Sequence, residues 1–268
     1  MMLRPLSLES FNPFPAASVA ARAHAETEFP RESVGLILTE SGEYVPLENT
    51  SPEPEEAFEI SEADEERYQG QIAAVVHSHC FRKGDFDPKD GPLARGPSAA
   101  DMAQQQEMSC PWGLVVVVDS HALEPLFWGD QLPNVAPMIA RPFVHGIFDC
   151  YTAIRDSYRT DSFGFVRQFY DTDSIVLPDF PRSYEWWGVP QGEQIVGRTA
   201  NLYLDNFEKA GFKRISKEQA RPGDVFLAQI GSDVPNHGGV YLGNGQIYHH
   251  LRRRCSRRES GGQWMDYV

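Results

Sequence analysis

A proline-containing segment without hydrophobic periodicity separates two halves of this chain that differ in charge. Residues 131–142 carry three prolines among mixed polar and apolar residues, which is typical of a linker. Residues 1–130 contain 23 acidic and 8 basic residues, whereas residues 131–268 contain 15 acidic and 16 basic residues. Since 268 residues are enough for two buried cores, we predict an α+β chain with one domain over 1–130, a linker over 131–142 and a second domain over 143–268.

Composition and charge exclude several classes of protein. The acidic first half is unsuited to nucleic acid, because a phosphate backbone requires clustered Lys and Arg. The one basic cluster is 252–254 with Arg257 and Arg258, which we interpret as a solvated segment, although five arginines can also bind an anionic surface. The chain has no apolar run of transmembrane length and no signal peptide, which predicts a soluble cytoplasmic product with no transmembrane segment. The four cysteines show no CxxC pairing, so free thiols are expected.

Helix and strand signals alternate through the first half. The predicted elements are a helix over 17–27, a strand over 34–38 with a hairpin partner over 43–47, a strand over 57–60, a helix over 62–69, a buried strand over 72–76, a helix from 97, and strands over 112–118 and 123–128. The buried strand leads directly into the sequence His77-Ser78-His79.

A candidate metal site follows that buried strand. Side chains alternate along a strand, so His77 and His79 share one face, as two ligands of one metal ion require. Asp101, one turn into the next predicted helix, completes a set of two histidines and one carboxylate with a fourth position left for water, the open arrangement of a catalytic zinc. Glu32 is placed to act as general base and Ser98 to donate to an oxyanion. The alternative is that the histidines end the strand by chance and that Ser98 only caps the helix.

The second half begins with a cysteine at a predicted helix start. Asp149 precedes Cys150, and apolar residues recur at helical spacing after it, which predicts that Cys150 begins a helix. The positive end of the helix dipole then favours the nucleophilic thiolate over the thiol. An aromatic, proline-containing segment over 161–192 follows. The remaining predicted elements are a helix over 196–210 and strands over 225–230, 237–242 and 246–251.

Three histidines on the last two strands supply the base that Cys150 needs. His237 against a thiol at a helix start is the arrangement of papain-like active sites, in which a third group orients the imidazole. If the turn is a two-residue loop, Asn244-Gly245, His250 shares a face with His237. If it has three residues, 243–245, His249 shares that face instead. The alternative for the whole set is an inert buried thiol and a histidine held in a turn.

A resemblance to a known family rests on the first set of residues. Glu32, the strand residues 35–37, the sequence His77-Ser78-His79 and the segment 97–101 resemble the JAMM metalloprotease motif of MPN-fold α/β domains, over roughly residues 15–130. The resemblance implies one zinc ion held by the two histidines and the aspartate, with the glutamate as base and the serine as oxyanion donor. One departure is the 18-residue segment 80–97, longer than is usual, with Cys80 where a proline is common; it is compatible with a lid, a docking element or a decayed metal site.

The second half resembles another family. Phe148-Asp149-Cys150, the segments 221–225 and 237–245, and His249 resemble the NlpC-type cysteine peptidases, which cleave the peptides of peptidoglycan. This implies a papain-like α+β domain with Cys150 as nucleophile, His237 as base and His249 as the third polar residue. Many members have a tyrosine upstream of the nucleophile that shapes the oxyanion site, whereas this chain has Phe143 and His145 in that neighbourhood.

The order of the two domains is itself informative. A JAMM domain followed by an NlpC domain resembles the phage lambda-like tail tip assembly proteins over nearly the whole chain. The resemblance implies a virion tail tip protein, present in the host cytoplasm during assembly, whose partners are other tail tip proteins and a peptidoglycan peptide substrate. The alternative is a structural assembly protein whose peptidase sites are vestigial or used only in processing. A metal-dependent isopeptidase acting through the first domain is the third interpretation.

Overall fold

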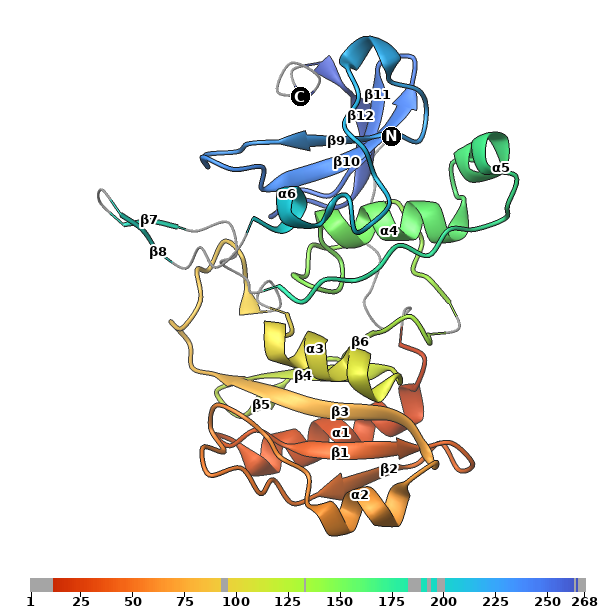
Figure 1. The fold of residues 1–268 in the computed structure, drawn as a ribbon. Helices are drawn as coiled ribbons and strands as arrows, with labels where there is room; N and C mark the ends of the chain where they lie inside the picture. Colours follow the sequence, from red (N-terminus) through yellow and green to blue (C-terminus); the bar gives the residue numbers. More distant parts are fainter. Residues whose placement is uncertain are drawn as a thin grey trace. The chain divides into compact units, whose positions relative to one another are not determined.

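The computed structural model describes residues 12–92, 96–132, 134–182, 189–191, 194–196, 201–262 and 264 (Figure 1). The described chain divides into two compact units, the first formed mainly by residues before 135 and the second mainly by residues from 135 onward. Each unit combines helices with its own sheet, which confirms the predicted α+β class. Among the described residues, no helix has both the length and the apolar character that crossing a membrane requires.

One mixed sheet forms the centre of the first unit, with its strands in the order β2-β1-β3-β4-β5 and β6 also paired to β4 (Figure 1). The strands are β1 (Val34–Leu38), β2 (Tyr44–Leu47), β3 (Ile72–Phe81), β4 (Trp112–Val118), β5 (His121–Ala122) and β6 (Leu126–Trp128), and the helices are α1 (Pro15–Glu28), α2 (Glu62–Tyr68) and α3 (Ala99–Met108). The predicted hairpin of β1 with β2 is confirmed by their antiparallel pairing. The predicted helices of this half are also present, with ends shifted by a few residues.

The face of the sheet opposite α1 is the one that carries the candidate metal ligands. Small side chains at four-residue spacing on α1, including Ala21 and Ala25, pack in one cluster with Val76 of β3. Because side chains alternate along a strand, His77 and His79 point away from that cluster. β3 runs parallel to β4, and α3 lies in the connection between them, as a parallel pair requires.

Residues 57–60, predicted to be a strand, are not one. A side chain takes part in hydrogen bonds that a neighbouring strand would make: Asn49 Nδ2 donates to the carbonyl of Ala57 at 3.0 Å, and Asn49 Oδ1 accepts from the N–H of Glu59 at 3.1 Å. The apolar and acidic alternation of this segment fits a strand, but an Asn that bonds to the backbone can replace a regular ladder.

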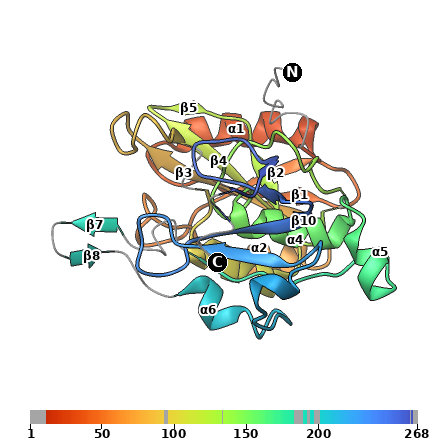
Figure 2. The same cartoon turned by 90° about the horizontal axis from the view of Figure 1, so that it is seen from above.

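The second unit is built on one helix and a four-stranded antiparallel sheet, with the order β12-β11-β10-β9. Figure 2 shows α4 (Cys150–Thr160) beside β10 (His237–Gly243). The other elements are α5 (Phe165–Tyr170), β7 (Val189–Gln191), β8 (Gln194–Val196), α6 (Leu202–Asn206), a 3₁₀ helix (Lys217–Gln219), β9 (Val225–Ala228), β11 (Gln246–His249) and β12 (Arg257–Ser260). The apolar stripe of α4, with Tyr151, Ile154 and Tyr158, packs in one cluster with Val240 of β10.

One predicted helix of the second half differs in extent, and other elements of this half were not predicted. Of the helix expected over 196–210, Val196 belongs to a strand, residues 197–200 lie outside the described residues, and the helix present is Leu202–Asn206. The strand β12 was not predicted, and it contains Arg257 and Arg258 of the basic cluster. Within the segment 161–192, α5 was not expected, and Trp186-Trp187 lies outside the described residues.

Part of the segment predicted as a linker packs into the second unit. The side chain of Arg141 is fully buried; its Nη1 donates to Asp156 Oδ2 at 2.5 Å and its Nε to the carbonyl of Pro137 at 2.8 Å. A buried guanidinium needs such partners, because an unpaired charge costs several kcal/mol in the interior, on the order of the whole stability of a domain. The predicted domain limits themselves stay a prediction.

We expect Gly239→Ala to destabilise the second unit. A Cβ at this position of β10 would lie 2.5 Å from the Tyr248 carbonyl oxygen and 2.7 Å from Phe226 Cε1, so two strands would have to shift. Overpacking of this kind lowers the free energy of unfolding by about 1–3 kcal/mol. Chemical denaturation followed by circular dichroism measures it.

The neighbouring substitution Gly238→Ala is the matched control. Its Cβ meets Ile154 Cδ1 at 3.1 Å and no atom closer than that, so a smaller loss of stability is expected. Equal stability of Gly239→Ala and the unmodified chain would contradict the close approach of β10 to β11.

Candidate catalytic and metal sites

The candidate nucleophile sits at a helix start that a buried carboxylate holds in place. Asp149 caps α4: its Oδ1 accepts from the N–H of Thr152 and its Oδ2 from the N–H of Gly146, both at 2.9 Å. The guanidinium Nε of Arg182 donates to the same Oδ2 at 2.9 Å. Burial opposes ionisation of Asp149, but the charges of Arg182 and His145 together with these hydrogen bonds hold the pKa of its carboxyl well below the usual range.

Cys150 opens α4, as predicted, yet its pKa moves in the direction opposite to that expected at a helix start. Burial raises the pKa of the thiol to about 11, and the Asp149 carboxylate adds to the rise. The hydroxyl of Tyr203, which donates to Cys150 Sγ at 3.1 Å, and the backbone N–H of Gly238 act in the other direction. The resting side chain is therefore a thiol at neutral pH, and a base has to remove its proton during the reaction.

The base candidate lies on β10, one residue before Gly238. His237 Nε2 is 3.0 Å from His249 Nδ1 of β11. Burial lowers the pKa of His237 to about 3, and positive charge on His249 or His250 lowers it further. His237 is therefore neutral across the physiological range and can accept a proton.

The register of β10 against β11 shows which histidine faces His237. The turn itself is the two-residue Asn244-Gly245, closed by the pair Gly243 and Gln246. An irregularity between Tyr241 and Gly243 then shifts the register by one residue, so that Gly239 pairs with His249, the pairing expected of a three-residue turn. His250 points to the other face, where its ring packs edge-on to Phe143 with centroids 5.3 Å apart. The geometry places His249, and not His250, beside His237; a catalytic role for His249 stays a prediction.

Two residues of this site could not be foreseen from the sequence. One is Tyr203, whose hydroxyl reaches the sulfur from α6, downstream of the nucleophile; the upstream His145 lies against Asp149 instead, with Nδ1 3.8 Å from Oδ2. The other is Glu259 on the unpredicted β12, whose Oε1 is 2.8 Å from His249 Nε2. Residues 257–260 are all polar, so no apolar alternation in the sequence signals the strand that carries Glu259.

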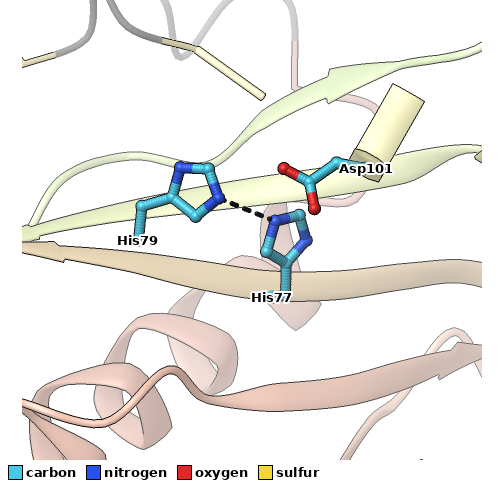
Figure 3. A group of neighbouring side chains, drawn as sticks. All are labelled: His77, His79 and Asp101. Atoms are coloured by element: carbon cyan, nitrogen blue, oxygen red, sulfur yellow. Dashed lines mark hydrogen bonds between the residues drawn. The ribbon is translucent and has the colours of Figure 1, made fainter. Parts of the chain in front are cut away.

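The predicted metal ligands lie close together beside β3 (Figure 3). His77 and His79 come from β3 and Asp101 from the first turn of α3, and one ligand atom of each lies within 4.8 Å of the others. The Nε2 atoms of the two histidines are 3.4 Å apart. Tetrahedral zinc with Zn–N bonds of about 2.0–2.1 Å requires a separation of about 3.3 Å, so the pair of imidazoles fits such an ion.

The other two residues of the predicted metal centre differ in how the structure places them. Glu32 is buried, with Oε1 3.9 Å from His79 Nε2, which is close enough for a base beside a metal ligand. Ser98 is exposed and caps α3: its Oγ accepts from the N–H of Asp101 at 3.1 Å. Capping uses the serine oxygen as an acceptor and leaves its O–H as a donor, so the capping and oxyanion interpretations are compatible.

Cys80 is positioned away from this set. Its Sγ lies 3.3 Å from the carbonyl of Arg31, on the strand face opposite His79. Burial raises the pKa of the Cys80 thiol to about 11, whereas a metal ligand is a thiolate. These observations favour a packed thiol at Cys80 over a metal ligand. All four cysteines of the chain are free thiols.

Comparison with known proteins identifies the domain family of the second half and the protein family of the whole chain. Residues 140–267 match the model of the NlpC/P60 family, so this part is an NlpC/P60 domain. The tail tip assembly protein K of Escherichia phage lambda is 35% identical over 191 residues, which cover 71% of this chain and 75% of that protein. The tail tip assembly protein K of Escherichia phage N15 is 29% identical over 254 residues, covering 92% and 89% of the two chains. The chain belongs to the tail tip assembly protein K family, and both predicted resemblances to these families are confirmed; the JAMM site stays a prediction.

We expect Tyr203→Phe to make Cys150 less reactive. The Tyr203 hydroxyl donates to Sγ and so favours the thiolate, and its removal raises the pKa of the thiol further above about 11. Alkylation of Cys150 by iodoacetamide, followed by mass spectrometry between pH 7 and 10, should rise with pH in both proteins and be about 3- to 10-fold slower in the variant, as for the loss of one hydrogen bond that contributes about 1 kcal/mol.

Tyr68→Phe removes a hydroxyl from the first unit and serves as the control; its alkylation profile should match that of the unmodified protein. An unchanged rate in Tyr203→Phe would show that the hydroxyl does not act on the sulfur.

Proposed function

We propose that the chain is a phage tail tip protein that hydrolyses peptide bonds in peptidoglycan stem peptides through Cys150, His237 and His249. The observation that supports this most is the contact of His237 with His249 inside an NlpC/P60 domain, on the strand that packs against the Cys150 helix. A neutral, buried imidazole oriented by a second imidazole is the base that a thiol with a raised pKa requires.

The reaction then proceeds by two acyl transfers. His237 Nδ1 accepts the thiol proton of Cys150 while the sulfur attacks the scissile carbonyl carbon, and the imidazolium returns that proton to the departing amine. Water, deprotonated by the same imidazole, hydrolyses the thioester and restores the thiol. His249 accepts from His237 Nε2 throughout, which keeps the ring in one orientation.

The location and the partners of the chain follow from its relatives. Two relatives are named tail tip assembly proteins, which supports a place in the virion tail and contact with other tail tip proteins. During assembly we place the chain in the host cytoplasm. The acidic first half, with a net charge of −15 over residues 1–130 from 23 acidic and 8 basic residues, argues against nucleic acid as a further partner.

A second activity is proposed for the first unit, a JAMM-type zinc peptidase with His77, His79 and Asp101 as ligands of one zinc ion. The 3.4 Å separation of the two imidazole nitrogens and the carboxylate beside them support this assignment. Zinc in such a site supplies Lewis-acid activation of water and of a substrate carbonyl. Glu32 would accept the proton of the attacking water, and the Ser98 hydroxyl would donate to the developing oxyanion.

One observation favours a different class of function for the cysteine centre. The raised pKa of Cys150 means that the free protein holds little thiolate at neutral pH. A structural assembly protein whose peptidase sites are vestigial or used only in processing would tolerate this. The activity of Cys150 variants separates the two functions.

Cys150→Ala is expected to abolish peptidoglycan cleavage, because the sulfur forms the acyl intermediate. Purified protein is incubated with peptidoglycan sacculi, and newly exposed amino groups are quantified; the rate should fall by at least about 1,000-fold, to background. Cys255→Ala removes a free thiol from the same unit and should retain full activity. Cleavage by Cys150→Ala at the rate of the unmodified protein would contradict the assignment of Cys150 as nucleophile.

His77→Ala is expected to remove zinc from the first unit, because two remaining ligands bind zinc far more weakly than three. After zinc loading and desalting, elemental analysis should find about one zinc per unmodified chain and close to none in the variant. His121→Ala, which changes an exposed histidine of the same unit, should retain the metal. Zinc-free unmodified protein after loading would contradict the proposed centre.

A further inference from the structure

We propose that Glu259 is a positioning residue for the Cys150 centre, which fixes the tautomer of His249 and through it makes Nδ1 of His237 the base. This inference rests on the proposed function in one respect, that Cys150 is the nucleophile. It adds a fourth side chain to the set, from a strand that none of the sequence patterns indicated.

The contacts of Glu259 define its place. Its Oε1 lies 2.8 Å from His249 Nε2 and accepts from Trp264 Nε1 at 2.9 Å. Its Oε2 lies 2.9 Å from Arg257 Nε. Each of its two oxygens thus lies beside a nitrogen, and the hydrogen bond from Trp264 together with the charge of Arg257 holds the carboxylate in place. The pairing of β12 with β11, with His249 opposite Arg257, sets this arrangement.

The carboxylate next to His249 decides where the protons of the two histidines lie. Oε1 of Glu259 is 2.8 Å from His249 Nε2, and a carboxylate oxygen at that distance repels the lone pair of an unprotonated nitrogen, so the proton of His249 is on Nε2. His249 Nδ1 is then an acceptor, and the 3.0 Å contact requires His237 to donate from its Nε2. A neutral His237 protonated on Nε2 has an unprotonated Nδ1. Without an acceptor at Glu259, either tautomer of His249 satisfies the contact, and one of them places the His237 proton on Nδ1, where it blocks the reaction.

The charge of Glu259 adds a second effect. When His237 takes the thiol proton, positive charge appears in a buried position where charge on His249 or His250 opposes it, and Arg254 and Arg257 oppose positive charge on His249. Glu259 is the negative group that raises the pKa of His249 against burial. Its charge therefore stabilises the imidazolium through the histidine between them, as a buried carboxylate does in a Ser-His-Asp triad.

Glu259→Gln tests the inference with readouts that need no substrate. In the unmodified protein, nitrogen-15 histidine spectra should show His237 and His249 protonated on Nε2. In the variant, the Nδ1-protonated form should become populated in both residues. The apparent pKa of Cys150 from iodoacetamide alkylation should rise, because the imidazolium that accompanies the thiolate loses support, and peptidoglycan cleavage should fall at least about tenfold.

Two further variants keep the test sharp. Glu208→Gln changes an exposed glutamate of the same unit and should leave tautomers and alkylation unchanged. In His249→Asn the amide oxygen can accept from His237 directly, so adding Glu259→Gln to that variant should have no further effect on alkylation; an additional effect there would show that Glu259 does not act through His249. Thermal unfolding of each variant identifies any that fails to fold.

The outcomes separate the inference from the proposed function. Unmodified protein with His237 protonated on Nδ1, or a Glu259→Gln variant with unchanged tautomers and an unchanged or lowered Cys150 pKa, overturns the role of Glu259. Expected tautomers together with peptidoglycan cleavage that persists in Cys150→Ala overturns the peptidase assignment and leaves the positioning role supported.

Discussion

The buried carboxylate of Asp149 is the interaction on which the cysteine centre depends. It caps α4, accepts from the backbone before Cys150 and binds the buried guanidinium of Arg182. These contacts fix the direction in which the helix begins, and with it the direction of the thiol toward Tyr203 and Gly238. The same negative charge, one residue from the sulfur, disfavours the thiolate. The Asp149 carboxylate therefore fixes the position of the thiol and also raises its pKa, so ionisation of the thiol depends on the base.

Burial decides the protonation states around that thiol more strongly than the helix dipole does. A helix N-terminus contributes typically about 0.3–1 kcal/mol to a charge in its first turn, which corresponds to about 0.2–0.7 pKa unit. Removal of water from a buried group shifts a pKa by up to about 3–5 units. Cys150 moves up to about 11 and His237 down to about 3 for this reason. The free site therefore holds two neutral partners, unlike a preformed thiolate–imidazolium pair.

Local sequence patterns predicted the helices and strands that carry the candidate sites. The register between strands and contacts between distant segments determined which further residues join each site. Alternation placed His77 and His79 on one face, and helical spacing placed Cys150 at a helix start, both from residues close in sequence. The choice between His249 and His250 depended on an irregularity between Tyr241 and Gly243, because the two-residue turn alone would have placed His250 beside His237. Tyr203 and Glu259 reach the site across about 50 and 110 residues of chain from Cys150, and no local period encodes such a contact.

The low polarity that keeps Cys150 and His237 neutral also makes their partners effective. In a medium of low effective dielectric, a charge is costly alone but strongly stabilised by an oriented acceptor. His249 and Glu259 form such a line of acceptors, anchored at its exposed end by Arg257 and Trp264. The imidazolium that forms during proton transfer is therefore stabilised by groups already in place, with little reorganisation. A substrate that covers Cys150 would exclude further water, which strengthens each interaction along that line and also raises the cost of the two separate charges, so the oriented acceptors matter most when a peptide is bound.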